Sequence, residues 1–212
     1  MRILLLLVLL APILCTLGVD VSQHFATSTY QCIKNAGYHF ISIRGFCSNG
    51  VVDSNIVSNL NNARAAGFTP DIYMFPCRGK SATSQVDTMI SAISSNLYGK
   101  VWIDVETNPS PGCGWGSDHT TNCNFLTELV DRVKHHGKSV GIYASKYMWQ
   151  GIMGSFTACP ALGSEDLWYA HYDNNPSFSD FSSFGGWKTP HVKQFQGTST
   201  LCGAGVDKNY KP

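Results

Sequence analysis

The chain has 212 residues, of which 15 are Lys or Arg and 14 are Asp or Glu, so its net charge is close to zero. Phosphate binding needs a basic surface, which argues against a nucleic acid as partner. Only 14% of the residues are charged. This composition suits a secreted protein with a polar, uncharged groove, rather than a cationic protein that positive charge draws to bacterial envelopes.

The chain opens with MRILLLLVLLAPILCTLGVD, in which a single Arg precedes an uninterrupted apolar run and then small residues. This order is typical of a secretory signal peptide, and the apolar run is short for a membrane span. We therefore assign residues 1–16 to a signal peptide and residues 17–212 to one domain. We expect that domain to be a secreted monomer without stable membrane association, either extracellular or in the lumen of the gut or of a lysosome-related compartment.

Seven cysteines follow the leader: Cys32, Cys47, Cys77, Cys113, Cys123, Cys159 and Cys202. In an oxidising compartment they should form three disulfides and leave one thiol unpaired. We expect Cys113 to pair with Cys123 across the short loop between them, and Cys47 with Cys77, because both follow neighbouring strands. The unpaired thiol is then one of the other three. No two cysteines have the close spacing of structural zinc sites, so we expect no metal and no cofactor.

Short apolar runs alternate with helical segments along most of the chain. Strands are predicted at residues 18–23, 38–46, 72–77, 100–107 and 139–145, and helices at residues 27–36, 53–66, 82–97, 125–136 and 145–154. Three more strands follow at residues 166–173, 191–197 and 205–210, without room for full helices between them. Repeated strand–helix alternation implies parallel pairing with right-handed crossovers. Five strand–helix units followed by three strands predict an α/β fold, a degenerate TIM-like barrel.

The stretch VWIDVET, residues 101–107, places two carboxylates two positions apart in a predicted strand. Such side chains project from the same face, roughly 7 Å apart. Asp104 and Glu106 could form an exposed polar face or ion pairs, or they could be the acid and its partner in glycosidic-bond cleavage. In TIM-like barrels the active site lies at the C-terminal ends of the strands. Asp20, Asp173 and Asp207 should reach the same barrel mouth, which favours the catalytic interpretation.

Five motifs resemble a known family: GVDVSQ, WIDVE, GIYAS, LWYAHYD and KQFQGTSTLCGAGVDKN. They occur in the order found in the family 25 glycoside hydrolases, the Chalaropsis-type lysozymes. The resemblance runs from Gly18 to Tyr210 and is strongest to the secreted animal branch known from nematodes, which is linked to digestion of bacteria and to antibacterial defence. It implies a flattened barrel that hydrolyses the β-1,4 bond between N-acetylmuramic acid and N-acetylglucosamine in bacterial peptidoglycan.

The resemblance also implies residue roles. By motif position Glu106 matches the family's general acid. Asp104 matches its acidic partner, which either orients the substrate acetamido group or stabilises a developing oxazolinium. Asp20 matches a further acid that we include among the catalytic residues, and Asp207 matches an acid that we include among the substrate-binding residues. We expect Asp104 and Asp20 to raise the pKa of Glu106, because a further negative charge beside them is costly.

Aromatic side chains near strand ends are candidates for stacking on sugar rings: Tyr73, Tyr143, Trp168, Tyr169 and Tyr172. We expect two or three of the five in the cleft, because filling the barrel core is the commoner fate. We select Tyr73, Tyr143 and Tyr172 as substrate-binding residues. Trp102 shares the strand face of Asp104 but lies deeper, so it should pack beneath the site.

One stretch departs from the family pattern. Many members end their second strand in a Lys-Ala-Thr-Glu-Gly run, whereas this chain reads IRGFCSNG and lacks the Glu. The width and charge of that side of the cleft are thus open, and so is an alternative function, that of a catalytically weak or inactive glycan-binding protein. Two other hydrolase classes fit less well. Family 18 chitinases carry further Asp residues ahead of their acid, and Ser145 has no acid–His pair at a recognisable spacing.

Overall fold

The computed structural model describes residues 15–212. The predicted signal peptide lies outside the described residues except for its last two, Cys15 and Thr16, and the first strand begins at Thr16. Within residues 15–212, no helix has the length and apolar character needed to cross a membrane.

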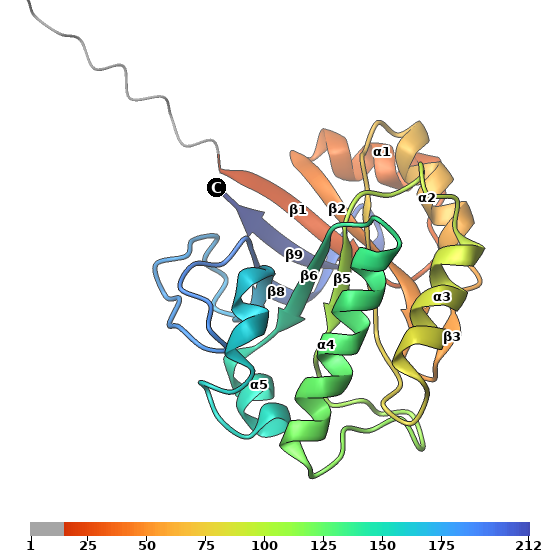
Figure 1. Cartoon of the computed structure of the whole chain (residues 1–212). Coiled ribbons are helices and arrows are strands. Elements are labelled where there is room, and N and C mark those ends of the chain that lie inside the picture. The colour runs from red at the N-terminus through yellow and green to blue at the C-terminus, as the bar shows by residue number, and fades with distance from the viewer. Residues whose placement is uncertain (1–14) are drawn as a thin grey trace, which may run out of the picture.

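Within the described chain, eight strands close into a barrel, which confirms the predicted fold class (Figure 1). Around the ring they are β1 (Thr16–Val21), β9 (Ala204–Lys211), β8 (Val192–Leu201), β7 (Asp166–Ala170), β6 (Val140–Ala144), β5 (Val101–Asp104), β4 (Asp71–Met74) and β2 (Tyr38–Cys47). Strand β2 pairs with β1 and closes the ring. All neighbours run parallel except β9, which is antiparallel to both β8 and β1. A short strand β3 (Val51–Val52), absent from the sequence prediction, pairs with the end of β2.

Five α-helices of the described chain pack outside the strands: α1 (Thr27–Asn35), α2 (Ile56–Ala65), α3 (Ala82–Ala92), α4 (His119–His135) and α5 (Lys146–Met153). A 3-10 turn, Pro160–Ser164, precedes β7. Helix α4 begins at His119 rather than at residue 125, because Asp118 caps it by accepting a hydrogen bond from the Thr121 backbone N–H at 3.2 Å. Helix α3 ends at Ala92, short of the predicted residue 97. In Figure 1, α3 and α4 lie side by side in front of the barrel.

Aromatic rings fill the inside of the barrel. A small buried cluster consists of Trp102, Tyr143, Trp168 and Val192. Trp102 packs edge-on against Trp168, with ring centroids 5.6 Å apart, which confirms that it packs beneath the polar mouth. Gly141 on β6 makes this possible, because a β-carbon there would lie 2.3 Å from the Trp102 ring. The barrel is therefore a packed core rather than a pore, with its chemistry confined to one end.

Three disulfides join Cys32 to Cys202, Cys77 to Cys113 and Cys123 to Cys159. The predicted number is confirmed, but the predicted pairs Cys113–Cys123 and Cys47–Cys77 are both wrong. The unpaired thiol that follows the leader is Cys47, not one of the three cysteines from which we expected it, and Cys15 at the edge of the leader is also free.

Local structure explains the corrected pairing. Because α4 starts at His119, Cys123 belongs to that helix and contacts Met153 of α5, on the side from which Cys159 approaches. Cys113 instead meets Cys77, because the loops after the adjacent strands β4 and β5 run together. The Arg78 backbone N–H donates to the Cys113 carbonyl at 3.1 Å. The loop after β5 is therefore anchored to the loop after β4.

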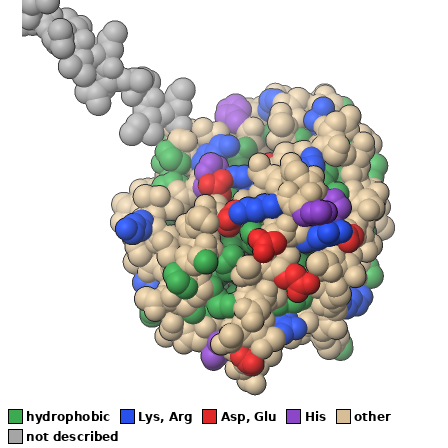
Figure 2. All heavy atoms as spheres, in the orientation of Figure 1, with side chains coloured by type: hydrophobic (Ala, Val, Ile, Leu, Met, Phe, Trp, Pro, Cys, Tyr) green, Lys and Arg blue, Asp and Glu red, His purple; other side chains and the backbone are tan. Residues whose placement is uncertain are grey.

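Charges of both signs are mixed on the face that carries α3 and α4 (Figure 2). Several of them form ion pairs, such as Arg132 with Asp87 at 2.6 Å and Lys134 with Glu165 at 2.5 Å. No block of a single sign gathers on this face, which agrees with the near-neutral composition.

Candidate active site

A pocket of about 100 Å³ lies at the mouth of the barrel. Its lining residues are Asp20, Tyr73, Asp104, Glu106, Tyr143, Trp168, Tyr172, Gln194 and Asp207. All seven residues that the sequence predicts for the site are among them. The fold therefore brings together side chains that are spread over almost the whole length of the domain.

The strand arrangement explains this convergence. Strands β4 to β8 are parallel neighbours, so their C-terminal ends meet at one rim. Asp104 is the last residue of β5, and the next residue still bonds to β6, because the Val105 N–H donates to the Tyr143 carbonyl at 2.8 Å. Glu106 follows directly. Asp20 lies opposite Asp207 in the antiparallel β1–β9 register, so these two acids are neighbours.

Asp20 is buried and is held by two side-chain amides. Its Oδ1 accepts hydrogen bonds from Gln194 Nε2 at 2.8 Å and from Asn209 Nδ2 at 2.7 Å. Burial, with the charge of Asp207 next in size, raises the pKa of Asp20 from 3.8 to about 8, while the two amide donors act to lower it. Asp20 thus holds a proton over much of the range in which an ordinary Asp is ionised.

The carboxyl groups of Asp104 and Glu106 are close enough to affect each other's protonation. Asp104 is the deeper of the two, and burial followed by the charge of Glu106 raises its pKa well above the ordinary value. Burial also raises the pKa of Glu106, and Asp207 adds to the rise, but the neighbouring Asp104 carboxyl acts to lower it. We expected Asp104 and Asp20 to raise the Glu106 pKa; the pKa is raised, but by burial first and then by Asp207.

Asp207 completes the group of four acids. Burial raises its pKa, and the backbone N–H of Thr198, which donates to Oδ1 at 2.6 Å, opposes that rise. The nine lining residues of this pocket include no Lys, Arg or His. Without a neighbouring cation the four acids cannot all ionise at moderate cost, so the pocket retains protons near neutral pH.

Four of the five candidate aromatic residues line the pocket, more than the two or three expected: Tyr73, Tyr143, Trp168 and Tyr172. The fifth, Tyr169, points to the outer side of β7 and donates to Asp180 Oδ1 at 2.9 Å. Tyr172 is 57% exposed, so part of its ring is available at the rim. The hydroxyls of Tyr143 and Tyr172 both donate to Gln194, at 2.6 and 2.8 Å.

Sequence reasoning missed two amides of the site, Gln194 and Asn209. Trp168 donates its indole N–H to Asn209 Oδ1 at 2.8 Å, which turns the Asn209 Nδ2 toward Asp20. A signal was present, because Asn209 shares a strand face with Asp207 and alternation with a period of two would have placed both inside the barrel. Amide side chains in strands are common on surfaces, and the role of Asn209 depends on its contacts with Trp168 and Asp20, which lie on other strands.

Asp173, which the sequence also placed at the barrel mouth, lies outside the pocket. It pairs with Lys193 at 2.7 Å. At the end of β2, where the family pattern has an acid, Arg44 forms an ion pair with Asp53 at 2.8 Å and donates to the Ser22 carbonyl at 2.9 Å. This corner contributes structure rather than a fifth acid, since no residue of IRGFCSNG lines the pocket.

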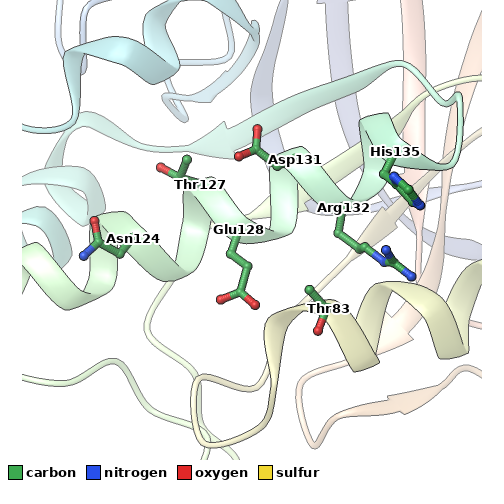
Figure 3. Close-up of a pocket in the computed structure, with 7 residues that line it drawn as sticks. All are labelled: Thr83, Asn124, Thr127, Glu128, Asp131, Arg132 and His135. Carbon is green, nitrogen blue, oxygen red and sulfur yellow. The ribbon is translucent and has the colours of Figure 1, made fainter.

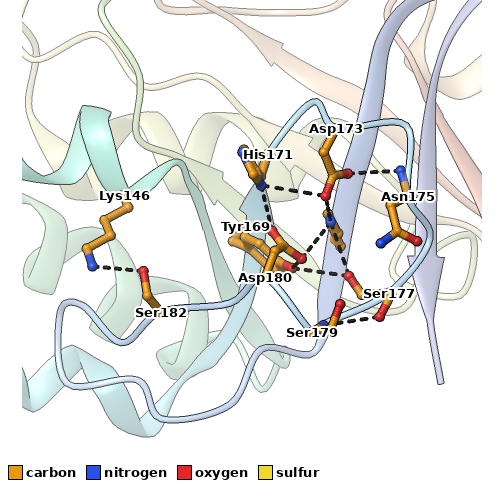
Figure 4. Close-up of polar contacts among 10 residues, drawn as sticks. Lys146, Tyr169, His171, Asp173, Asn175, Ser177, Ser179, Asp180 and Ser182 are labelled. Carbon is orange, nitrogen blue, oxygen red and sulfur yellow. Dashed lines mark hydrogen bonds and ion pairs between the residues drawn. The ribbon is translucent and has the colours of Figure 1, made fainter.

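His171, Asp173 and Asp180 form the group of the described chain best arranged to hold a cation (Figure 4), with ligand atoms within 4.8 Å of one another. The ammonium group of Lys193, which is fully buried, already lies between the two carboxylates, 2.7 Å from each. Asp180 also contacts His171 Nδ1 at 2.6 Å. We therefore regard the cluster as a salt-bridge network that anchors the segment after β7.

A larger hollow of about 460 Å³ lies on the outside of the molecule, between α3 and α4 (Figure 3). Thr83 lines it from α3, and Asn124, Thr127, Glu128, Asp131, Arg132 and His135 line it from α4. Arg132 is engaged by Asp87 on α3. This hollow is a groove between two packed helices and contains none of the predicted site residues.

An eight-stranded barrel with acids gathered at the C-terminal rim is an arrangement that glycoside hydrolases use. The profile of a family described as "Lysozyme-like protein 1" matches residues 12–195. The chain is 43% identical over 201 residues to probable GH family 25 lysozyme 2 of Dictyostelium discoideum, covering 92% of this chain and 90% of that protein. It is 39% identical over 202 residues to lysozyme-like protein 5 of Caenorhabditis elegans, covering 92% and 91%.

The fold matches solved structures as well. A family GH25 lysozyme from Aspergillus fumigatus superposes with a TM-score of 0.78 at 20% identity, covering 93% of this chain and 94% of that one. The bacterial lysozyme from Streptomyces coelicolor gives a TM-score of 0.75 at 25% identity, covering 92% and 90%. The chain belongs to the glycoside hydrolase family 25 lysozymes, as its motifs imply.

Proposed function

We propose that the protein is a secreted muramidase that hydrolyses the β-1,4 bond between N-acetylmuramic acid and N-acetylglucosamine in bacterial peptidoglycan. The observation that carries the proposal is the pocket itself, in which four carboxyls lie among tyrosines without a cation. Relatives that are named lysozymes support the same reaction class.

Glu106 is the proposed general acid. Asp104 lies beneath it with 5% exposure, whereas Glu106 is only partly buried, so Glu106 is the acid that can reach a glycosidic oxygen. A general acid must hold a proton at working pH, and burial raises the Glu106 pKa in that direction. Asp104, whose pKa burial raises well above the ordinary value, lies beside it.

The other acids act around the developing charge on the sugar. Asp104 either orients the acetamido group or stabilises an oxazolinium, and Asp20 is the third acid of the catalytic group. Asp207, Tyr73, Tyr143 and Tyr172 are proposed to hold the substrate. A pocket of about 100 Å³ is small beside ligand sites of about 300–1,000 Å³. The glycan chain would therefore lie across the rim, with one linkage over the acids.

Secretion is part of the proposal. It is supported by the predicted signal peptide over residues 1–16 and by three disulfides, which persist in oxidising compartments. In that setting the activity would serve digestion of bacteria or antibacterial defence.

Digestion of purified peptidoglycan by the mature chain tests the proposal. We expect soluble fragments with reducing muramic acid ends. Glu106→Gln keeps the shape but removes the proton donor, so it should lower the rate by about 100-fold or more while the variant remains folded. Glu128→Gln, on the exposed face of α4, is the matched control and should remain fully active. An active Glu106→Gln variant would mean that another group is the acid.

The alternative is a weak or inactive glycan-binding protein of the same fold, favoured by the acid that is missing from the end of β2. It predicts co-sedimentation with insoluble peptidoglycan or chitin and no released fragments. The same digest separates the two functions.

A further inference from the structure

A buried amide connects the tyrosines of the pocket to its acids. Gln194 is 3% exposed. Its Oε1 accepts hydrogen bonds from the hydroxyls of Tyr143 at 2.6 Å and Tyr172 at 2.8 Å. Its Nε2 donates to Asp20 Oδ1 at 2.8 Å and to Asp207 Oδ2 at 3.4 Å. Both ends of one amide are thus occupied by residues that line the pocket.

The acids and the tyrosines together determine which way this amide faces. A carbonyl oxygen can only accept, so both hydroxyls that contact Oε1 must donate to it. If the amide were turned over, Oε1 would oppose Asp20 Oδ1, which already accepts from Asn209 at 2.7 Å. That contact would then depend on the proton of Asp20 itself and would be lost when Asp20 ionises. The acids therefore favour the orientation in which the N–H groups point at them, and in that orientation Oε1 accepts from both phenols.

The position of Tyr172 is itself fixed, although the residue is 57% exposed. Its ring lies against Gly197, where an added β-carbon would be 3.0 Å from the ring. Its neighbours in sequence are anchored by the salt-bridge network (Figure 4): His171 contacts Asp180, and Asp173 contacts Lys193. The hydroxyl of Tyr172 is thereby directed at Gln194.

We propose that Gln194 is a positioning residue of the active site, whose amide, oriented by Tyr143 and Tyr172, presents its N–H donors to the neighbouring carboxyls of Asp20 and Asp207. Like charges on facing strands repel, and an N–H group that donates to both offsets part of that repulsion. Any effect of Gln194 on catalysis rests on the proposed function, whereas its effect on the pKa of Asp20 is independent of that function.

The proposal makes a signed prediction about Asp20. The groups around it are Asp207 and Asn209 on β9, Gln194 on β8, Tyr73 on β4, Tyr143 on β6, Tyr172 after β7, and Asp104 and Glu106 at the end of β5. Burial and Asp207 raise the Asp20 pKa to about 8, and Gln194 is one of two donors that lower it. Removing the Gln194 N–H groups should therefore raise the pKa further.

Carbon-13 NMR titration of the aspartate carboxyls in the folded mature chain tests this directly, with Asp20→Asn identifying the Asp20 signal. Gln194→Met keeps the length of the side chain and removes its hydrogen bonds. We expect the Asp20 midpoint to rise by about 0.5 pH unit or more. The double variant Tyr143→Phe, Tyr172→Phe should shift it in the same direction, because Oε1 then loses both donors and the amide is held less firmly against the acids. Gln85→Met, equally buried at 3% and bonded to the Cys77 backbone, is the matched control and should leave the midpoint in place.

An unchanged Asp20 midpoint in folded Gln194→Met would overturn the proposal, and so would an equal shift in the Gln85→Met control. If Gln194→Met does not fold, the double tyrosine variant decides in the same way. In the active enzyme the pH profile of kcat/KM should move upward together with the midpoint. The titration does not require enzymatic activity. A wild-type chain that does not hydrolyse peptidoglycan would therefore refute the proposed function, while the titration would still decide the role of Gln194.

Discussion

Trp115 donates its indole N–H to the backbone carbonyl of Glu106 at 2.8 Å. The Trp115 ring packs edge-on against Phe125 of α4, with centroids 5.8 Å apart. The same loop is anchored by the disulfide between Cys113 and Cys77. Glu106, the proposed general acid, lies beyond the last residue of β5, and the anchored loop that carries Trp115 fixes its backbone position.

Trp115→Phe should separate positioning from packing. The change keeps an aromatic ring against Phe125 and removes the N–H donor. We expect the free energy of unfolding to fall by about 1 kcal/mol. We also expect kcat to fall by about tenfold with little change in KM, because a small displacement of a reacting group is costly. Denaturant unfolding and steady-state kinetics measure the two effects.

Trp187→Phe is the matched control. Trp187 donates its indole N–H to the Glu165 carbonyl at 2.7 Å, and it does not line the pocket. It should lose at least as much stability, because Trp187 is fully buried, and it should keep its activity. Equal losses of activity in both variants would show that Trp115 acts on stability alone.

The acid pocket should make the protein less stable as the pH rises. The pKa of Asp20 is 3.8 when unperturbed and about 8 in the fold. Folding therefore favours the protonated form. Its contribution is fully present below about pH 4 and is lost as the pH rises through about 8. The raised pKa values of Asp104 and Glu106 act in the same direction. Calorimetry from about pH 5 to pH 8 should show a falling melting temperature, with a shallower fall in Asp20→Asn.

Carboxylates outside the pocket, Asp87 and Asp180 most strongly, have lowered pKa values and make the protein less stable as the pH falls. Hydrogen bonds from Arg132 and His136 lower the pKa of Asp87 to about 2. Partial burial acts to raise the pKa of Asp180, but hydrogen bonds from Lys193 and His171 lower it to about 2. Their contribution is present above about pH 4 and is lost as the pH falls toward 2. Maximum stability is thus expected at mildly acidic pH. Asp87→Asn should reduce the fall of the melting temperature below about pH 4 and leave the fall toward pH 8 unchanged. A melting temperature that peaks above pH 8 would contradict this account.

The barrel and its four acids could be predicted because both depend on local patterns. Strand–helix alternation fixes the parallel order, and that order sends Asp104 and Glu106 to the same rim as Asp20. Asp207 reaches the rim from the antiparallel β9, where it lies opposite Asp20. The disulfides could not be predicted in this way. The start of α4, which depends on the Asp118 cap, decides that Cys123 faces away from Cys113. A shift of a few residues in one helix boundary was enough to make the pairing wrong.

The amides of the site were missed for a related physical reason. Gln194 and Asn209 matter because Tyr143, Tyr172 and Trp168, on other strands, fix their orientation. Asp173 was misplaced because its partner, Lys193, lies on β8 and could not be paired with it from spacing. Local patterns place each residue near the rim, whereas the hydrogen-bond partners that define its role come from distant parts of the chain.

Lys193 provides the last prediction, because it is a fully buried cation between two carboxylates. Its ammonium lies 2.7 Å from both Asp173 and Asp180 and 3.1 Å from the Ser177 carbonyl. Lys193→Met would leave two acids facing each other in a partly buried site, which should lower the free energy of unfolding by about 3–5 kcal/mol. The segment that carries Tyr172 should also loosen, so KM should rise at temperatures where the variant is folded.

Two variants make that prediction specific to the network. Adding Asp173→Asn and Asp180→Asn to Lys193→Met removes the opposed charges, so it should restore part of the lost stability. Lys134→Met breaks an exposed pair with Glu165, in which the lysine side chain is 49% exposed, and should cost less than about 1 kcal/mol. Urea unfolding of the four chains, wild type included, decides the matter. If Lys193→Met costs no more than Lys134→Met, the buried cation does not anchor the segment that carries Tyr172, and the position of that ring depends on Gly197 and Gln194 alone.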